Sequence, residues 1–226
     1  MNSGFTKASI MTLKHYSDLI RNLPFLDQAF ETKKSTWEAD CADIRFNEFF
    51  QKKFQETTVR ISRRDLFHQC EGDSYTGIIS IIFWGYPRNM RGSHFSNILD
   101  SIQKIEKIIS NQRHLNSSGF KTITDELKGT GMGLSTLTKL LYFFRFTLEG
   151  YQCLIFDKRI IEVLNKKRYK ELIELSGISE YNKNDRYCHY LKVMHENSEA
   201  LSVKPDQLEL FLFQFGNNLK SETNYQ

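Results

Sequence analysis

Proline and glycine are scarce in this chain of 226 residues, which contains 3 Pro and 12 Gly. A sandwich or barrel of short strands normally needs more turn residues than this, so the composition favours helices with few breaks. The chain also lacks an apolar run of about 20 residues, the length that a membrane-spanning helix requires. Its most apolar stretch, residues 78–84, is much shorter. We therefore expect an all-α protein with no membrane partner.

Cysteines are few as well, and the four in the chain include no CxxC pair. This sparse spacing argues against a disulfide-stapled scaffold and against a zinc site, so we expect reduced thiols and no metal.

Residues 1–7 lack the apolar core of a signal peptide, which favours a cytoplasmic location. The high aromatic content, with 18 Phe and 10 Tyr, excludes a disordered chain.

The net charge of +4 is mild, but it is unevenly distributed along the chain. Residues 1–85 hold 11 basic and 11 acidic side chains, residues 86–170 hold 15 and 7, and residues 171–226 hold 5 and 9. The middle segment therefore carries a net charge of +8. A basic segment of this kind is typical of a nucleic-acid-binding surface, although a solvated helical surface gives the same pattern.

Helical spacing of apolar residues recurs along the chain, and no repeat or low-complexity tract interrupts it. An extended segment is expected at 152–156 and a loop at 116–119. The spacing predicts helices at 13–23, 26–32, 41–55, 62–69, 74–84, 93–112, 120–127, 134–146, 157–164, 168–175, 185–196 and 205–215. The helix at 74–84 is expected to be buried, because nearly all of its second half is apolar.

A glycine hairpin, residues 127–133, joins two of the predicted helices and contains Gly129, Gly131 and Gly133. The first amide groups of a helix have no partner within the helix, so they are available to bind a phosphate. Glycine allows the backbone to approach that phosphate closely, and Gly131 and Gly133 are the pair assigned to this contact. Such a contact would bind phosphate without reading sequence. A dinucleotide site is not indicated, because the glycines follow a helix and not a strand.

Asp157 follows the apolar residues 153–156 and opens a predicted helix. A carboxylate in this position is suited to act in a partly dry pocket. It is equally suited to cap the helix by accepting a backbone hydrogen bond, and the two roles are compatible.

The order of hairpin glycines, helix, short extended run and aspartate resembles the helix-hairpin-helix DNA glycosylases. It is most similar to the compact bacterial members of the 8-oxoguanine glycosylase branch, and the segment 83–92 also resembles those proteins. The resemblance covers about residues 80–165. It implies that residues 1–226 form one domain of two helical lobes around a base pocket, with the hairpin and the catalytic aspartate in a core at 80–165.

The resemblance also implies the chemistry. Asp157 matches the aspartate that supports attack at the sugar C1′ and stabilises the positive charge there. Counting from Gly133 places the family's Schiff-base lysine at Ser135, whereas counting back from Asp157 places it near Lys139. Positions 135 and 139 share one helix face, so Lys139 can reach the same pocket. If Lys139 only packs its stem on the protein, Asp157 acts alone or catalysis is lost.

Further residues are candidates for DNA contacts. Trp84 and Tyr86 are suited to stack on a base, although Trp84 can equally belong to the core. Arg88 and Arg91 are suited to bind phosphate, although they can equally pair with surface acids. The phosphate contacts that we expect, besides the three glycines of the hairpin, are Ser135, Lys158, Arg159, Arg88 and Arg91.

Three functions remain open from the sequence. The first is a DNA glycosylase, with or without strand cleavage, that removes a modified purine such as 8-oxoguanine. The second is an inactive glycosylase fold that binds nucleic acid or serves as a partner subunit, in the setting of a phage-defence operon. The third is a purely structural helical protein. We expect a monomer that binds DNA, with protein partners encoded nearby. No cofactor is expected, and a monovalent cation at the hairpin is left open.

Overall fold

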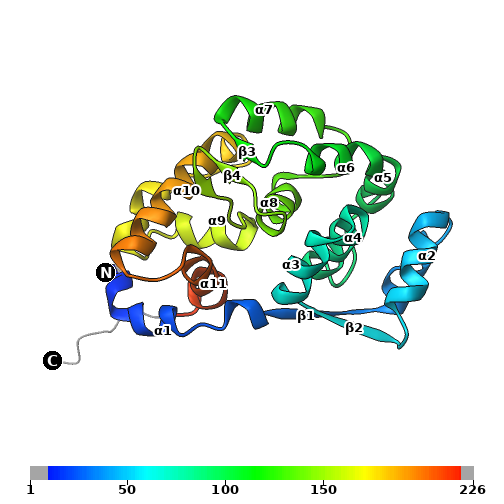
Figure 1. Ribbon diagram of the computed structural model, residues 1–226. Coiled ribbons are helices and arrows are strands. Elements are labelled where there is room, and N and C mark those ends of the chain that lie inside the picture. The colour runs from blue at the N-terminus through cyan, green and yellow to red at the C-terminus, as the bar shows by residue number, and fades with distance from the viewer. Residues whose placement is uncertain (1–9, 220–226) are drawn as a thin grey trace, which may run out of the picture. The chain divides into compact units, whose positions relative to one another are not determined.

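The computed structural model describes residues 10–219 and is mostly helical (Figure 1). The chain divides into two compact units. Residues 24–155 form a continuous unit, and the segment up to Leu23 combines with the segment from Phe156 into a discontinuous unit. Residues 1–9, on which the expectation of no signal peptide rests, lie outside the described residues, as do residues 220–226. The predicted core at 80–165 spans the boundary between the two units.

Helix α4, Ser74–Gly85, is the centre of the continuous unit. Nine of its residues are buried, from Tyr75 to Trp84, and it packs against α3, α6, α8 and β1 (Figure 1). A helix that is apolar on all sides is stable only when it is covered on all sides, so the predicted buried helix is confirmed. The other helices of this unit are α2 (Ile44–Lys53), α3 (Arg63–Glu71), α5 (His94–Asp100), α6 (Ile102–Ser110), α7 (Ser117–Glu126) and α8 (Leu134–Phe143).

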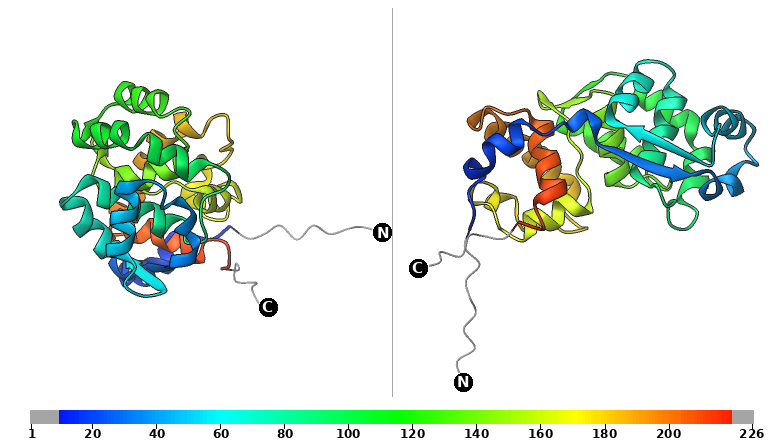
Figure 2. Two further views of the ribbon diagram at one scale, coloured as in Figure 1. Left: turned by 90° about the vertical axis from the view of Figure 1, so that its right-hand side faces the viewer. Right: turned by 90° about the horizontal axis from the view of Figure 1, so that it is seen from below.

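The continuous unit also contains strands. The all-α prediction is therefore correct for most of the elements, but it missed two small sheets. Strand β1, Ala29–Lys33, pairs antiparallel with β2, Thr58–Ser62, in a register that places Ala29 opposite Ser62 (Figure 2, right). The helix predicted at 26–32 is therefore wrong. A second, small sheet joins β3 (His114–Leu115), β4 (Thr147–Leu148) and β5 (Tyr151–Gln152). Short 3-10 turns lie at Phe25–Asp27, Lys34–Thr36 and Glu38–Asp40.

Two further predictions in this unit are corrected. The single helix at 93–112 is two helices, because Ser101 has non-helical backbone angles, φ −100° and ψ 6°, between α5 and α6. The loop at 116–119 is already the start of α7. The Asn116 side chain caps that helix by accepting a hydrogen bond from the backbone of Gly119, so the first turn begins at Ser117.

The discontinuous unit is helical in all its described regular elements. It contains a 3-10 turn at Leu13–Tyr16, α1 (Ser17–Arg21), α9 (Lys158–Asn165), α10 (Lys183–Ala200) and α11 (Pro205–Phe215). The predicted helix at 168–175 is a 3-10 helix over Lys170–Leu175. Helix α11 packs against α1, α9 and α10, and Pro205 occupies its first turn.

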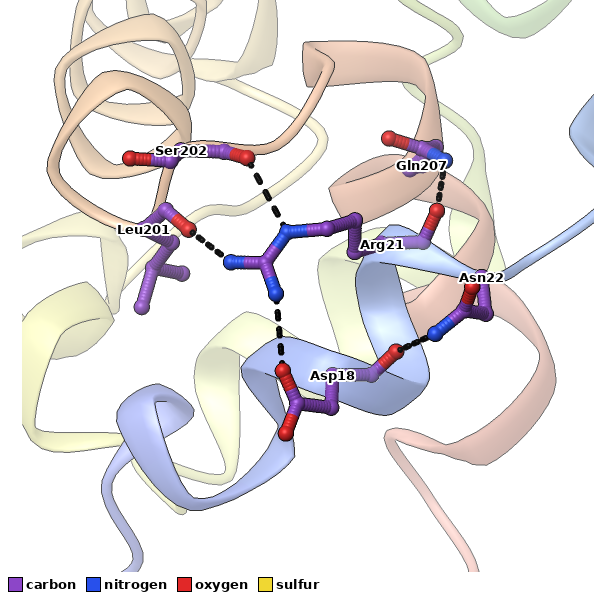
Figure 3. Close-up of polar contacts among 6 residues, drawn as sticks. All are labelled: Asp18, Arg21, Asn22, Leu201, Ser202 and Gln207. Carbon is purple, nitrogen blue, oxygen red and sulfur yellow. Dashed lines mark hydrogen bonds and ion pairs between the residues drawn. The ribbon is translucent and has the colours of Figure 1, made fainter.

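Helix α1 is fastened to the turn between α10 and α11 by Arg21 (Figure 3). The Arg21 guanidinium donates to the carbonyls of Leu201, at 3.2 Å, and Ser202, at 3.4 Å, where α10 ends. It also pairs with Asp18 at 2.7 Å, and the Gln207 side chain donates to the Arg21 carbonyl at 2.5 Å. A cation at the carbonyl end of a helix satisfies groups that have no partner within the helix.

Candidate functional site

The glycine hairpin joins α7 to α8 through a backbone that requires glycine. Gly129 and Gly131 have φ values of +81° and +79°, in the left-handed region that residues with a Cβ rarely adopt. At Gly131 there is a second reason, because a Cβ there would lie 2.3 Å from the carbonyl oxygen of His94. Gly131 is therefore fixed by close packing of two backbones, independently of any ligand.

The two sides of the hairpin differ in character. Leu127, Thr130 and Met132 are buried, and the Thr130 hydroxyl donates to the Leu127 carbonyl at 2.7 Å. Gly129 and Gly133 are exposed, and a Cβ at either would meet no atom within 4 Å. Gly133 is the residue before α8, with an extended backbone, so an exposed glycine directly precedes the amide end of this helix. This is the geometry that phosphate binding needs, and the phosphate contact itself stays a prediction.

An arginine loop, residues 86–93, joins α4 to α5, and the residues at its two ends lie close to α8 and to the hairpin. The hydroxyls of Tyr86 and Thr136 lie 2.7 Å apart, and the backbone of His94, directly after the loop, packs against Gly131. Asn89 in the middle has φ +77° and donates through its side chain to the carbonyl of Thr36, at 3.1 Å. The loop is therefore held in a strained conformation by contacts on several sides.

Arg88 and Arg91 lie in this loop and are both exposed. Among residues 10–219 neither forms a salt bridge. The alternative in which these arginines pair with surface acids is therefore not seen in the part of the chain that the structure describes. Two exposed cations beside the hairpin suit contacts to phosphate.

Lys139 lies in α8, and its side chain is directed back toward the start of the helix. Its Nζ donates to the Ser135 hydroxyl at 2.8 Å and to the Ser135 carbonyl at 3.2 Å, and it lies 5.6 Å from the centre of the Tyr86 ring. Only 5% of the lysine is exposed. The expectation that positions 135 and 139 share one face is confirmed, and the structure brings Tyr86, Ser135 and Lys139 together.

Trp84 is a buried residue of α4, with 3% of its surface exposed. Its ring lies against those of Phe30, at 5.1 Å, and Phe143, at 5.3 Å, between ring centres. These contacts are those of a core residue. Stacking on a base stays a prediction for Trp84 and for the half-buried Tyr86.

Arg63 is a buried charge that the sequence interpretation missed. Its guanidinium donates to the Gln28 side chain at 2.6 Å and to the Tyr142 hydroxyl at 3.1 Å, and it lies 5.6 Å from the centre of the Trp84 ring. A signal was present, because Arg63 stands at helical spacing with Leu66, Phe67 and Cys70, the buried face of α3. Planar guanidinium groups suit such aromatic surroundings.

Asp157 belongs to the discontinuous unit, whereas Lys139 belongs to the continuous one. The Asp157 carboxylate caps α9 by accepting a hydrogen bond from the backbone of Ile160, at 3.1 Å, which confirms its capping role. The next two residues, Lys158 and Arg159, are exposed in the first turn of the helix. The guanidinium of Arg159 lies 4.7 Å from the centre of the Phe213 ring. The catalytic and phosphate-binding roles of these residues stay predictions.

No cluster of His, Cys, Asp and Glu among residues 10–219 is suited to hold a metal ion. Burial raises the pKa of the Cys70 thiol to about 12, so this thiol stays protonated and is a poor metal ligand. The monovalent cation at the hairpin stays a prediction.

Within the described part of the chain, every helix is too short or too polar to cross a membrane.

A family model matches residues 24–213, a range that includes the glycine hairpin, Lys139 and Asp157. Its description reads "Putative 8-oxoguanine DNA glycosylase OGG-like protein". Neither a curated protein nor a solved structure matches the chain. The family model covers most of the chain and agrees with the resemblance carried by the hairpin and the aspartate. The chain therefore belongs to this family of 8-oxoguanine DNA glycosylase-like proteins.

Proposed function

We propose that this protein is a DNA glycosylase that removes a modified purine such as 8-oxoguanine, with Lys139 as its nucleophile. The observation that carries the proposal is the setting of Lys139. Its amine donates to Ser135 and lies 5.6 Å from the centre of the Tyr86 ring, and the lysine is buried one turn into the helix that follows the glycine hairpin. A lysine held at the amide end of a helix, beside exposed cations, is well placed to meet the sugar of a DNA strand bound by its phosphates.

The proposed reaction forms a covalent intermediate. The neutral amine of Lys139 adds to the sugar C1′ while the bond from C1′ to the base breaks. The departing base keeps the electron pair of that bond and takes up a proton released by the nitrogen. Ring opening then breaks the C1′–O4′ bond, O4′ takes the remaining proton from the nitrogen, and a Schiff base is left between Lys139 and C1′.

Asp157 is assigned the stabilisation of the positive charge that develops on the sugar as the base leaves. The family membership supports this role, because the matched range includes Asp157. Its capping bond to Ile160 holds one carboxylate oxygen in a fixed position, which is what electrostatic stabilisation of a developing charge requires. Lys158 and Arg159, exposed at the start of α9, are assigned phosphate contacts.

Borohydride trapping tests the proposal directly, because hydride converts the Schiff base into a stable secondary amine that links protein to DNA. With duplex DNA containing 8-oxoguanine, the wild-type protein is expected to form the cross-link. Lys139→Ala is expected to lower its yield at least 100-fold. The matched control is Lys128→Ala, because Lys128 lies in the same hairpin but is exposed and paired with Asp125 at 2.6 Å.

The possible outcomes of the trapping experiment distinguish the candidate functions. A cross-link that persists in Lys139→Ala shows that another residue is the nucleophile. Base release without any cross-link supports an enzyme that relies on Asp157 alone, and Asp157→Asn is then expected to abolish release. Binding of DNA without release of any modified base would contradict the proposal and favour the inactive binding subunit.

Removing both loop arginines, in Arg88→Ala with Arg91→Ala, is expected to weaken DNA binding mainly at low salt. The slope of log affinity against log salt is negative, and each lost phosphate contact reduces its magnitude by about 0.9. The double variant should therefore reduce the magnitude by about 2. Fluorescence anisotropy at several salt concentrations measures the slope. Arg64→Ala is the control, since Arg64 is an exposed arginine of the same unit already paired with Asp27 at 2.8 Å. An unchanged slope in the double variant would show that the arginine loop does not contact the DNA phosphates.

A further inference from the structure

Gly85 is the last residue of α4, and the space beside it is filled by Lys139. A Cβ at position 85 would lie 3.0 Å from Cδ and 3.2 Å from Cε of the lysine, closer than most side-chain contacts. The backbone of Gly85 lies outside the left-handed region, so its conformation does not require glycine. The missing side chain therefore matters for the space it leaves to the Lys139 stem.

Tyr86, the next residue, bounds the lysine on another side. Its ring centre lies 5.6 Å from Nζ of Lys139, and its hydroxyl is fixed by Thr136, which belongs to the same helix as the lysine. Ser135 accepts two hydrogen bonds from Nζ. The stem of Lys139 is thus limited by Gly85, and its amine is held by Tyr86 and Ser135.

We propose that Gly85 and Tyr86 are positioning residues that set where the Lys139 amine meets the sugar. This inference rests on the proposed function, because it assigns the two residues to the reaction of that lysine. Reaction requires the attacking and attacked atoms to approach within about 3–3.5 Å in the right direction, and a displacement of about 1 Å can cost 100-fold in rate. A methyl group at position 85 has to push the lysine stem aside by a few tenths of an ångström or more.

The decisive variants are Gly85→Ala and Tyr86→Leu, measured in single-turnover trapping with saturating protein. Gly85→Ala is expected to slow cross-linking about 10-fold or more while the Kd for DNA stays within 2-fold. Its melting temperature should equal or exceed that of the wild type, since alanine is the better helix residue. Tyr86→Leu should slow cross-linking similarly, and Tyr86→Phe, which keeps the ring, should restore most of the rate.

Gly119→Ala is the matched control for the alanine substitution. Gly119 lies in helix α7 of the same unit, and a Cβ there would meet only ordinary contacts, with Asn116 at 3.4 Å and Leu115 at 3.6 Å. Its cross-linking rate is expected to match that of the wild type. A structural role of Gly85 would lower the melting temperature, whereas a positioning role lowers the rate at constant melting temperature and constant Kd.

The possible failures are distinguishable. If the wild type forms no cross-link, the nucleophilic role of Lys139 and the positioning role that rests on it fall together. If the wild type cross-links through Lys139 but Gly85→Ala and Tyr86→Leu react at its rate, only the positioning role is overturned. If Gly85→Ala fails to fold, the comparison of Tyr86→Leu with Tyr86→Phe decides. Equal rates in those two variants would then refute the proposal.

Discussion

Replacing Gly131 with alanine is expected to lower the free energy of unfolding by about 2–5 kcal/mol, the combined cost of a left-handed backbone and of overpacking. The added Cβ would lie 2.3 Å from the His94 carbonyl oxygen. The position of a Cβ is fixed by its own backbone, and its neighbour is a backbone atom, so neither can rotate away as the end of a flexible side chain would. Urea denaturation followed by circular dichroism measures the loss. A midpoint equal to that of the wild type would contradict the described packing of the hairpin on His94.

Gly133→Ala provides the matched comparison within the same hairpin. Its backbone has φ −82°, and a Cβ meets nothing within 4 Å, so the expected loss of stability is below about 1 kcal/mol. The new methyl group lies on the exposed side, where the phosphate is predicted to bind. Gly133→Ala is therefore expected to weaken DNA binding in a folded protein, whereas weaker binding in Gly131→Ala would be confounded with unfolding. Unchanged affinity in Gly133→Ala would argue against a close phosphate at this position.

Trp84→Ala is expected to cost about 3–5 kcal/mol, the usual range for removing a buried large aromatic side chain. The ring fills the space between Phe30 and Phe143 and lies under the guanidinium of Arg63, so its removal leaves a cavity beside a buried charge. Thermal and urea unfolding measure the loss. A loss below about 1 kcal/mol would show that the surroundings collapse freely, which a tightly packed core does not do.

Trp84→Phe separates packing from base recognition. The indole nitrogen of Trp84 is buried without a hydrogen-bond partner among the described residues, so phenylalanine removes no hydrogen bond seen in the structure. The expected cost is smaller than that of Trp84→Ala, because phenylalanine keeps most of the aromatic volume and leaves a smaller cavity. If Trp84 is only a core residue, this variant cross-links DNA at the wild-type rate. A stable variant with a reduced rate on 8-oxoguanine would instead support the predicted contact of Trp84 with the base.

Elements with a strong local signal were predicted from the sequence. The buried helix α4, the cap at Asp157 and the start of α11 at Pro205 each depend on residues within one or two turns. The shared face of Ser135 and Lys139 follows from helix geometry alone, and their hydrogen bond agrees with it. The approach of Tyr86 to Thr136 was not predictable in this way. Those residues are 50 positions apart, and no local pattern encodes their contact.

Strand β1 was missed because its inward face carries only one strongly apolar residue, Phe30, followed by the polar Thr32. The one fully buried residue of the strand is Thr32, whose hydroxyl accepts from the Trp37 indole at 2.8 Å and donates to the Pro87 carbonyl at 2.9 Å. A strand is recognised in a sequence by alternating apolar residues, and this strand has no such alternation. Its partner, β2, begins only after an intervening segment that contains α2. The strand therefore pairs with a segment that is distant in the sequence, and its most buried residue is polar.

The break at Ser101 was missed for a different reason. Apolar residues continue at helical spacing from α5 into α6, and Ser101 interrupts the helix without shifting that spacing. The Ser101 amide still donates to the carbonyls of Asn97 and Ile98, so the preceding helix ends without leaving this donor unsatisfied. Hydrophobic periodicity reports which face is buried, and it does not detect a local change of backbone angles.

The discontinuous unit has a consequence for the order of folding during synthesis. Arg21 finds its partners 180 and 181 residues later in the chain, at Leu201 and Ser202. Contacts between such distant residues close long loops and form late, and domains that are synthesised first generally fold first. Residues 24–155 therefore leave the ribosome while the segment before them still waits for α10 and α11. A nascent chain that has reached residue 155 already contains the hairpin and Lys139, but Asp157 and the helices that hold α1 are still to be made.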